Sequence, residues 1–212
     1  MTGTSAAVRT TVCIVDDDPG IRNSLEMVME SADLPARLYA SATELLADLE
    51  ANLTHDCCGC ILLDLQMPGM TGIELLRRLR ELGYDSPVIV VTGTATILSA
   101  VESMKLGAVD FLEKPIDHRI LLNKIQQALA AHAAKRVEAS EVVAIRDRMA
   151  TLTDRELELV RLVVSGLANK HIADEMGISI KTVANHRANL MAKAGALNAA
   201  DLVRMSMIAG IV

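Results

Sequence analysis

The fold of this chain is decided by residues 60–69, with the sequence CILLDLQMPG. Four apolar residues are followed at once by Asp64 and then by a loop that contains proline and glycine. A short, wholly apolar run that ends in turn residues is typical of a strand buried on both faces, as in the middle of a parallel sheet. Asp64 therefore stands at the carboxyl end of a predicted central strand, 60–64, and open α/β sheets bind their ligands at that end of the strands.

Other apolar runs in the first half of the chain end in the same way. Between them lie segments with helical spacing of apolar residues and with capping residues at their starts, such as Asp18 before Pro19. Five strand-then-helix units predict an α/β domain, a doubly wound five-stranded parallel sheet with helices on both faces. The remaining predicted strands, with the polar groups that follow them, are 11–15 with Asp16 and Asp17, 88–91 with Thr92, 109–112 with Lys114, and the short strand 36–39.

These polar groups are expected to meet at one edge of the sheet, because the carboxyl ends of parallel strands lie on the same side. Three carboxylates from two strands offer the oxygen ligands that Mg²⁺ prefers. Asp17 and Asp64 are predicted direct ligands of Mg²⁺, or of Mn²⁺ in its place. Asp16 is expected to lie behind the direct ligands or to hold a bound water. The backbone carbonyl of Gln66 is a further predicted ligand.

Asp64 lies on the middle strand and is the residue best placed to accept a phosphoryl group. Because phosphoryl transfer is catalysed mainly by positioning and charge neutralisation, Lys114 is predicted to neutralise the phosphoryl oxygens and Thr92 to donate a hydrogen bond to one of them. Any one of these residues alone is more often a helix cap or a solvated loop charge. The combination at several strand ends favours a phosphorylation site.

Charge is unevenly distributed along the 212 residues, which together carry a formal net charge of −6. Residues 1–127 carry −8, whereas 128–150 and 151–212 carry +1 each, which indicates two domains with different partners. No apolar stretch approaches the roughly 20 residues of a membrane span, so no membrane partner is predicted. Residues 1–10 are polar and lack the apolar core of a signal peptide. We expect a flexible N-terminus and a cytoplasmic protein.

Three of the four cysteines, Cys57, Cys58 and Cys60, lie close together, and Cys13 lies in the first predicted strand. A zinc site would need a second cluster of ligands elsewhere, and the sequence has none. The favoured interpretation is that the cysteines are small apolar residues in a reducing cytosol. The alternative is an exposed, redox-active thiol at Cys57 or Cys58.

The last third of the chain has a purely helical rhythm. Residues 128–150 contain neither glycine nor proline and predict a helical linker, with a coiled dimer seam as the alternative. In residues 151–212 the capping residues Thr153, Ser179 and Asn198 alternate with glycines that end helices. They predict a four-helix, all-α domain in which 168–176, a turn at Gly177 and the next helix form a helix-turn-helix.

Two parts of the chain resemble known protein families. Residues 10–130 resemble a response-regulator receiver domain, a flavodoxin-like fold, and we place its boundaries at 11–127. The resemblance implies a cis peptide bond between Lys114 and Pro115, and a coupling of Thr92 to the aromatic residue Phe111. Phe111 has no hydroxyl, so such a switch would act through packing, and its alternative role is that of a core strand residue. The matching stretches are VDDD (15–18), LDLQMPG (63–69), VTG (91–93) and FLEKP (111–115).

Residues 152–208 resemble the LuxR-type output domain of regulators of the FixJ/NarL class. This implies binding to double-stranded DNA through the second helix of the helix-turn-helix, whose start meets bases or phosphates in such motifs. Relatives often carry longer side chains where this chain has Ala184 and Ala188, so base contacts are expected from few residues. The matches are LTDRE (152–156), Gly166, NKHIA (169–173), Ile178, Ser179, Thr182, Val183, His186 and Lys193.

The second helix of this motif has a polar face suited to DNA. Thr182, Asn185 and Asn189 share one face, and asparagine can pair with adenine in the major groove. Lys181 and Ser179 lie at the helix start, where bases or phosphates are met. The alternatives are a helical protein–protein module and an RNA-binding domain of the antiterminator kind. Predicted phosphate contacts are Lys170, Arg187 and Lys193, and His186 is expected to be structural or to contact phosphate.

We therefore interpret the chain as a phosphorylation-dependent transcriptional regulator of a two-component system, and not as an enzyme beyond Mg²⁺-dependent phosphorylation and dephosphorylation of itself. The expected partners are a sensor histidine kinase, double-stranded DNA and a second copy of the chain on activation. One alternative is a phosphorylation-independent DNA-binding protein whose receiver is a dimer scaffold. Another is a metal-dependent phosphatase or phosphotransferase, for which the short loops leave little material to build a substrate pocket.

Overall fold

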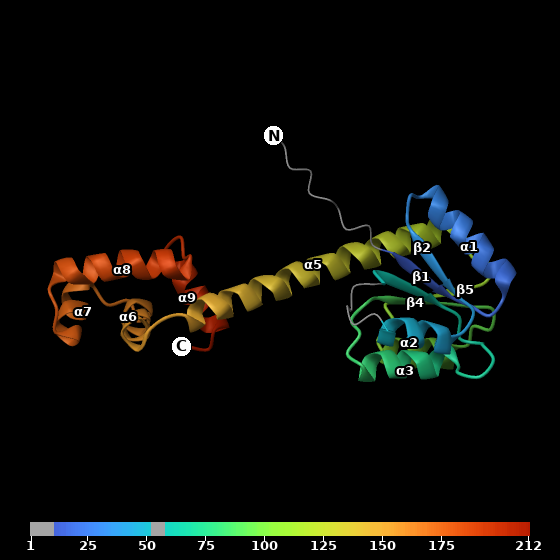
Figure 1. Ribbon diagram of the computed structural model, residues 1–212, viewed down its shortest axis with the longest axis horizontal. Helices are drawn as coiled ribbons and strands as arrows, with labels where there is room; N and C mark the ends of the chain where they lie inside the picture. The colour runs from blue at the N-terminus through green and yellow to red at the C-terminus, as the bar shows by residue number, and fades with distance from the viewer. Residues whose placement is uncertain (1–10, 52–57) are drawn as a thin grey trace. The chain divides into compact units, whose positions relative to one another are not determined.

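The first part of the chain forms the predicted parallel sheet. The computed structural model describes residues 11–51 and 58–212, so the predicted flexible segment 1–10 and the thiol of Cys57 lie outside the described residues. The five strands are parallel and lie in the order β2-β1-β3-β4-β5 (Figure 1). Their bounds are β1 Val12–Val15, β2 Ala36–Tyr39, β3 Cys60–Leu63, β4 Val88–Thr92 and β5 Asp110–Glu113.

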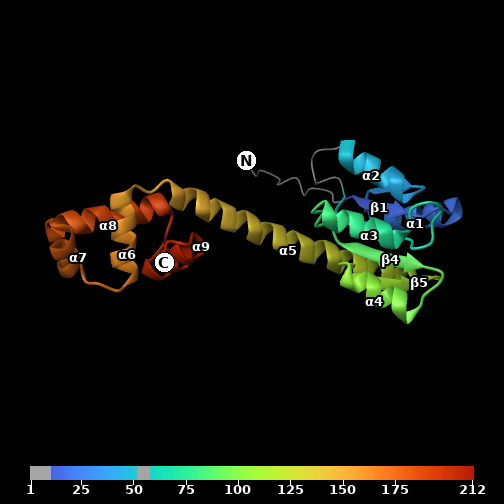
Figure 2. The ribbon, with the colours of Figure 1, turned by 90° about the horizontal axis from the view of Figure 1, so that it is seen from below.

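Helices cover both faces of this sheet (Figures 1 and 2). On one face, α1 (Pro19–Ser31) and the start of α5 (His118–Ala150) pack Leu25, Met29, Leu121 and Ile125 against alternate strand residues. The other face receives the leucines of α2 (Ala42–Ala51) and α3 (Gly72–Glu81), while α4 (Ile97–Lys105) contacts α3 and β5. Because side chains alternate across a strand, a strand that is buried on both faces must be apolar throughout. All four residues of β1 and of β3 are buried.

The strand order reverses between β1 and β3, and ligands bind at such a switch point in open α/β sheets. Val15 pairs with Leu63 in the register of these two strands. The backbone N–H of Asp64 donates to the carbonyl of Val15 at 2.9 Å. The residues that follow the two strands are therefore neighbours, although nearly 50 positions separate them in the sequence.

The end of α5 and the four helices that follow it form a second compact unit, residues 135–212. Ile145 and Met149 of α5 are buried in its core with apolar residues of the other helices. The helical prediction for 128–150 is confirmed, because α5 continues without a break to Ala150. The remaining helices are α6 Asp154–Val164, α7 Asn169–Met176, α8 Ile180–Ala194 and α9 Ala199–Ile208.

Local sequence signals account for the ends of these helices. Thr153 and Glu156 form the predicted capping box of α6, and the Ser179 side chain accepts from the N–H of Thr182 at the start of α8. Gly177 and Gly195 end α7 and α8 in the left-handed conformation, which glycine adopts without steric cost. Gly177 thereby makes the turn of the helix-turn-helix.

The cysteine prediction needs a correction. Cys13 of β1 and Cys58, just before β3, form a disulfide with a Cα–Cα distance of 5.8 Å. Because β1 and β3 are adjacent and both residues are buried, the two side chains meet in the core beneath α2 and α3. Cys58 is therefore neither exposed nor a free thiol. Cys60 is free and buried, as predicted, and burial raises its pKa to about 12.

Candidate functional site

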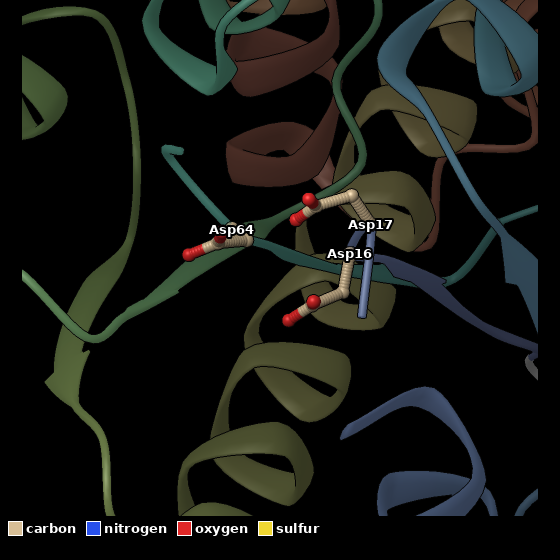
Figure 3. A group of neighbouring side chains, drawn as sticks. All are labelled: Asp16, Asp17 and Asp64. Atoms are coloured by element: carbon tan, nitrogen blue, oxygen red, sulfur yellow. The ribbon is translucent and has the colours of Figure 1, made fainter. Parts of the chain in front are cut away.

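Three carboxylates converge at the carboxyl ends of β1 and β3 (Figure 3). Asp16 and Asp17 follow β1, and Asp64 follows β3. Each offers one oxygen, and these oxygens all lie within 4.8 Å of one another. Asp16 and Asp64 are buried and Asp17 is exposed, so the cluster opens to solvent on the side of Asp17.

Lys114 approaches the cluster from the residue after β5. Its Nζ lies 2.6 Å from Oδ2 of Asp16 and 3.5 Å from Oδ1 of Asp64. The peptide bond from Lys114 to Pro115 is cis, as the resemblance implied. Among the residues predicted to meet here, Lys114 is thus in direct contact with Asp16 and within ion-pair distance of Asp64.

Asp64 is a buried member of the cluster that has an oxygen, Oδ1, without a hydrogen bond within the described part of the chain. Burial raises the pKa of this carboxyl; Lys114 opposes the rise and the charge of Asp16 adds to it. A buried carboxylate with an unsatisfied oxygen, beside two further carboxylates, fits a hard divalent cation, which would supply the missing partner and offset the like charges. The acidic cluster is therefore compatible with a bound metal ion.

The other predicted residues of this site lie around the cluster. Thr92 ends β4 and is fully buried, and its carbonyl accepts a hydrogen bond from the N–H of Lys114 at 2.9 Å. Gln66 is exposed in the loop after Asp64. Phe111 is half-buried, lies opposite Val90 in the β4–β5 register and packs against the core under α2 and α3. Its packing agrees with the alternative role of a core strand residue.

Two residues of the site were not predicted from the sequence. A Cβ added to Gly72 would lie only 2.3 Å from the carbonyl oxygen of Asp64. The start of α3 therefore packs directly on the backbone at the end of the central strand. Arg22 of α1 donates from Nη1 to the carbonyl of Asp16 at 2.6 Å. A glycine in the first turn of a helix, where its propensity is poor, was the one available signal for Gly72.

Two side chains of the polar face predicted for α8 already contact other helices of the same domain. Arg187 donates to Oδ1 of Asn169 in α7 at 2.8 Å, and Lys193 pairs with Glu156 of α6 at 2.7 Å. These two side chains tie α8 to its neighbours. Ser179 and Thr182 share the hydrogen bonds at the start of α8, with Thr182 half-buried. The exposed members of the predicted set are Lys170, Ser179, Lys181, Asn185, His186, Asn189 and Lys193.

Comparison with known proteins accounts for both halves of the chain. Residues 12–126 match the family described as "Response regulator receiver domain", and residues 150–206 match "Bacterial regulatory proteins, luxR family". The chain belongs to the two-component response regulators with a LuxR-type output domain. As a member of this family it is a transcriptional regulator with a receiver and a DNA-binding helix-turn-helix domain.

Individual response regulators resemble the chain over nearly its whole length. The transcriptional regulatory protein FixJ of Azorhizobium caulinodans is 40% identical over 200 residues, which cover 94% of this chain and 93% of FixJ. The C4-dicarboxylate transport transcriptional regulatory protein DctR of Rhodobacter capsulatus is 41% identical over 92% of this chain and 98% of its own. The solved structure of the response regulator StyR matches with a TM-score of 0.81 and 34% identity, covering 94% of this chain and 98% of StyR.

In this response regulator, the described helices include none that is both long and apolar enough to cross a membrane.

Proposed function

We propose that this response regulator accepts a phosphoryl group on Asp64 from a sensor histidine kinase and that the modification controls its binding to DNA. The convergence of three carboxylate oxygens within 4.8 Å, with Lys114 beside them, is the observation that carries the proposal. Asp64 is the nucleophile because it lies on the central strand and has an oxygen without a hydrogen-bond partner among the described residues. We place the protein in the cytoplasm, where a kinase and DNA would both be accessible.

Mg²⁺, with Mn²⁺ as a substitute, is the metal that we assign to the acidic cluster. Asp17, Asp64 and the backbone carbonyl of Gln66 would hold it, and Asp16 would lie behind these ligands or hold a bound water. When bound, the ion supplies positive charge that offsets the carboxylates and the phosphoryl oxygens. The chain's own contribution is to hold Asp64 in a buried, fixed position. Self-phosphorylation and dephosphorylation at Asp64 are the extent of its chemistry, so it is not an enzyme acting on other substrates.

Lys114 and Thr92 are the residues that we assign to the phosphoryl oxygens. Lys114 is already within 3.5 Å of Asp64, so a small movement from Asp16 brings its charge to a group on Asp64. Thr92 lies at the end of the adjacent strand β4, and its hydroxyl is the donor for a second oxygen. Phe111 lies on β5 beside β4, and a shift of Thr92 would reach it through packing.

We propose that phosphorylation promotes homodimerisation through the surface formed by α4, β5 and the start of α5. Ile97 and Leu98 of α4 are 84% and 82% exposed, and Val101, Met104, Val109 and Ile120 are exposed as well. Exposed apolar groups gathered in this way mark an interaction surface. Dimerisation would bring two output domains to adjacent half-sites on DNA. The proposed DNA-contacting residues are Lys170, Ser179, Lys181, Thr182, Asn185, His186, Arg187, Asn189 and Lys193.

Light scattering after gel filtration tests this proposal on the full-length protein. Beryllofluoride mimics an acyl-phosphate, so the wild type is run with and without beryllofluoride and Mg²⁺, and Asp64→Asn is run as the matched control. A monomer that becomes a dimer in the wild type alone supports Asp64 as the switch. Beryllofluoride binding without dimerisation would leave the phosphorylation site standing and overturn the dimerisation step. A wild type that binds no beryllofluoride contradicts the phosphoryl-acceptor role and favours the dimer-scaffold alternative.

A further inference from the structure

Arg22 reaches from α1 back to the acidic cluster. It lies in the first turns of the helix, and its half-buried side chain runs toward the loop that joins β1 to α1. Helical side chains tilt toward the helix N-terminus, which gives Arg22 this direction. Its Nη1 donates to the main-chain carbonyl of Asp16 at 2.6 Å. The contact is made to the backbone of the site and not to a carboxylate.

A guanidinium with a permanent charge and five N–H donors normally pairs with a carboxylate. Three carboxylates lie close by, yet no ion pair joins Arg22 to a carboxylate in the part of the chain that the structure describes. Its hydrogen bond goes instead to the peptide group that links Asp16 to Asp17. A cation on that carbonyl restricts the rotation of the peptide group.

The direction of Asp17 depends on this peptide group. Asp17 is exposed, and its carboxylate makes no hydrogen bond to another described residue, so its position follows from its backbone. Asp16 is held at four points: by Tyr39, Asp18, Lys114 and Arg22. The contacts from Asp18 and Lys114 use the carboxylate oxygens, which a metal ion would also use. Arg22 is the side-chain contact that leaves both carboxylates available.

We infer that Arg22 is a positioning residue for the acidic site: it holds the Asp16–Asp17 peptide so that both carboxylates face the position of the cation. This inference rests on the proposed role of the cluster as a Mg²⁺ and phosphoryl site. Outer partners that orient metal ligands typically change metal affinity 10–100-fold when they are removed. Since Arg22 acts through the backbone, we expect the lower end of that range.

The test is calorimetric titration of Mg²⁺ alone into the full-length protein. Arg22→Ala should weaken Mg²⁺ binding about tenfold, and Arg22→Lys, which keeps a charged donor, should recover most of the affinity. Arg80→Ala is the matched control. Arg80 lies in the last turn of α3 and also donates to a main-chain carbonyl, that of Lys105, at 2.8 Å. Its Mg²⁺ affinity should equal that of the wild type. Denaturant unfolding without metal runs in parallel, and Arg22→Gln replaces the alanine variant if that variant does not fold.

The outcomes separate the two proposals. A wild type that binds neither Mg²⁺ nor beryllofluoride overturns the proposed function and the role of Arg22 with it. If the wild type binds both, and the Arg22 variants bind Mg²⁺ as tightly, the phosphoryl-acceptor role stands and the positioning role is wrong. A loss of unfolding free energy in Arg22→Ala with unchanged Mg²⁺ affinity also contradicts positioning, because it shows a contact that serves folding alone.

Discussion

The role proposed for Asp64 makes two conflicting demands on it, because the residue is buried and a carboxyl nucleophile must be ionised. Burial is the main cause of its raised pKa, and the ammonium group of Lys114 opposes the rise. Lys114 lies closer to Asp16 than to Asp64, so its charge is shared between them. Without a metal ion, ionised Asp64 therefore destabilises the folded receiver. The same group becomes favourable when a cation occupies the cluster.

Replacement of Asp64 by asparagine is expected to stabilise the metal-free protein at neutral pH. A carboxyl whose folded pKa is raised costs stability in full above the folded pKa, and the cost disappears progressively as pH falls from the folded to the unfolded pKa. We expect the Tm of the receiver to rise by about 4 °C at pH 7, roughly 1 kcal/mol for a domain of this size, and the difference to shrink toward pH 4. Thermal unfolding in EDTA from pH 4 to 8 measures this. A less stable Asp64→Asn at pH 7 would contradict the assignment.

Gly72 allows the backbone at the start of α3 to lie very close to the backbone of Asp64 and Leu65. A Cβ at this position would lie 2.3 Å from the Asp64 oxygen and 2.8 Å from Leu65 Cα, so the backbone would have to move. We expect Gly72→Ala to lower the unfolding free energy by about 1–3 kcal/mol, because overpacking outweighs the better helix propensity of alanine. Gly93→Ala is the control, since a Cβ there meets no atom within 4 Å. Equal urea midpoints for the two variants would show that α3 can withdraw without cost.

Adjacent elements of the receiver are also joined covalently. The Cys13–Cys58 disulfide links β1 to the residues that lead into β3, across 45 positions in the sequence. Such a loop is expected to contribute about 3–4 kcal/mol by restricting the unfolded chain. Dithiothreitol should therefore lower the urea midpoint of the wild type and leave that of Cys58→Ser unchanged. A native protein in which both thiols react with a thiol reagent before any reduction would contradict the bond.

Helix α8 carries most of the proposed contacts to DNA. Some of its side chains are paired with other residues of the domain, and others are exposed without such a contact among the described residues. Lys181 is exposed at the start of α8, whereas Lys193 is paired with Glu156. Lys181→Ala should weaken binding to a random DNA duplex and reduce the slope of log K against log salt by about one, as for one lost phosphate contact. Fluorescence anisotropy at several salt concentrations measures both. Lys105→Ala in α4 serves as the control, and a Lys181→Ala slope equal to the control would remove Lys181 from the interface.

At the scale of the whole molecule, the proposed phosphorylation of the receiver would have to affect DNA binding by the output domain. Helix α4 contacts β5, which ends next to Lys114 (Figure 2). Among described residues, Ile97 and Leu98 of α4 are the most exposed large apolar side chains of the receiver. A second copy of the chain would bury them and couple the state of the acidic cluster to the pairing of output domains.

Ile97→Asp is therefore expected to abolish dimerisation in beryllofluoride while Asp64 still binds it. Because Ile97 is 84% exposed, the stability of the monomer should change by no more than about 0.5 kcal/mol. Met27→Asp is the matched control and should dimerise normally, because Met27 is 70% exposed on α1, which packs on the other face of the sheet from α3. Sedimentation velocity distinguishes the two variants. A dimer of Ile97→Asp would mean that another surface carries the association.

Much of this architecture was predictable from local patterns along the chain. Apolar strands, the polar residues that follow them and helix-capping residues are local patterns of a few residues, so they can be identified without a structure. Examples are the strand ends at Asp16, Asp17, Asp64 and Lys114 and the N-caps Thr153, Ser179 and Asn198. The parallel arrangement then follows from the strand-then-helix rhythm, and it brings the carboxyl ends of the strands to one edge. The sequence by itself therefore determined the fold class and the membership of the acidic site.

The tertiary structure alone decided which of these groups touch. The pairing of Lys114 with Asp16, the disulfide from Cys13 to Cys58, the contact of Gly72 with the Asp64 backbone and the hold of Arg22 on Asp16 each join residues on different elements. Their distances depend on strand order, register and helix packing together, and a difference of about 1 Å decides whether a hydrogen bond forms. No local pattern specifies a position that finely, because it results from the packing of the whole core.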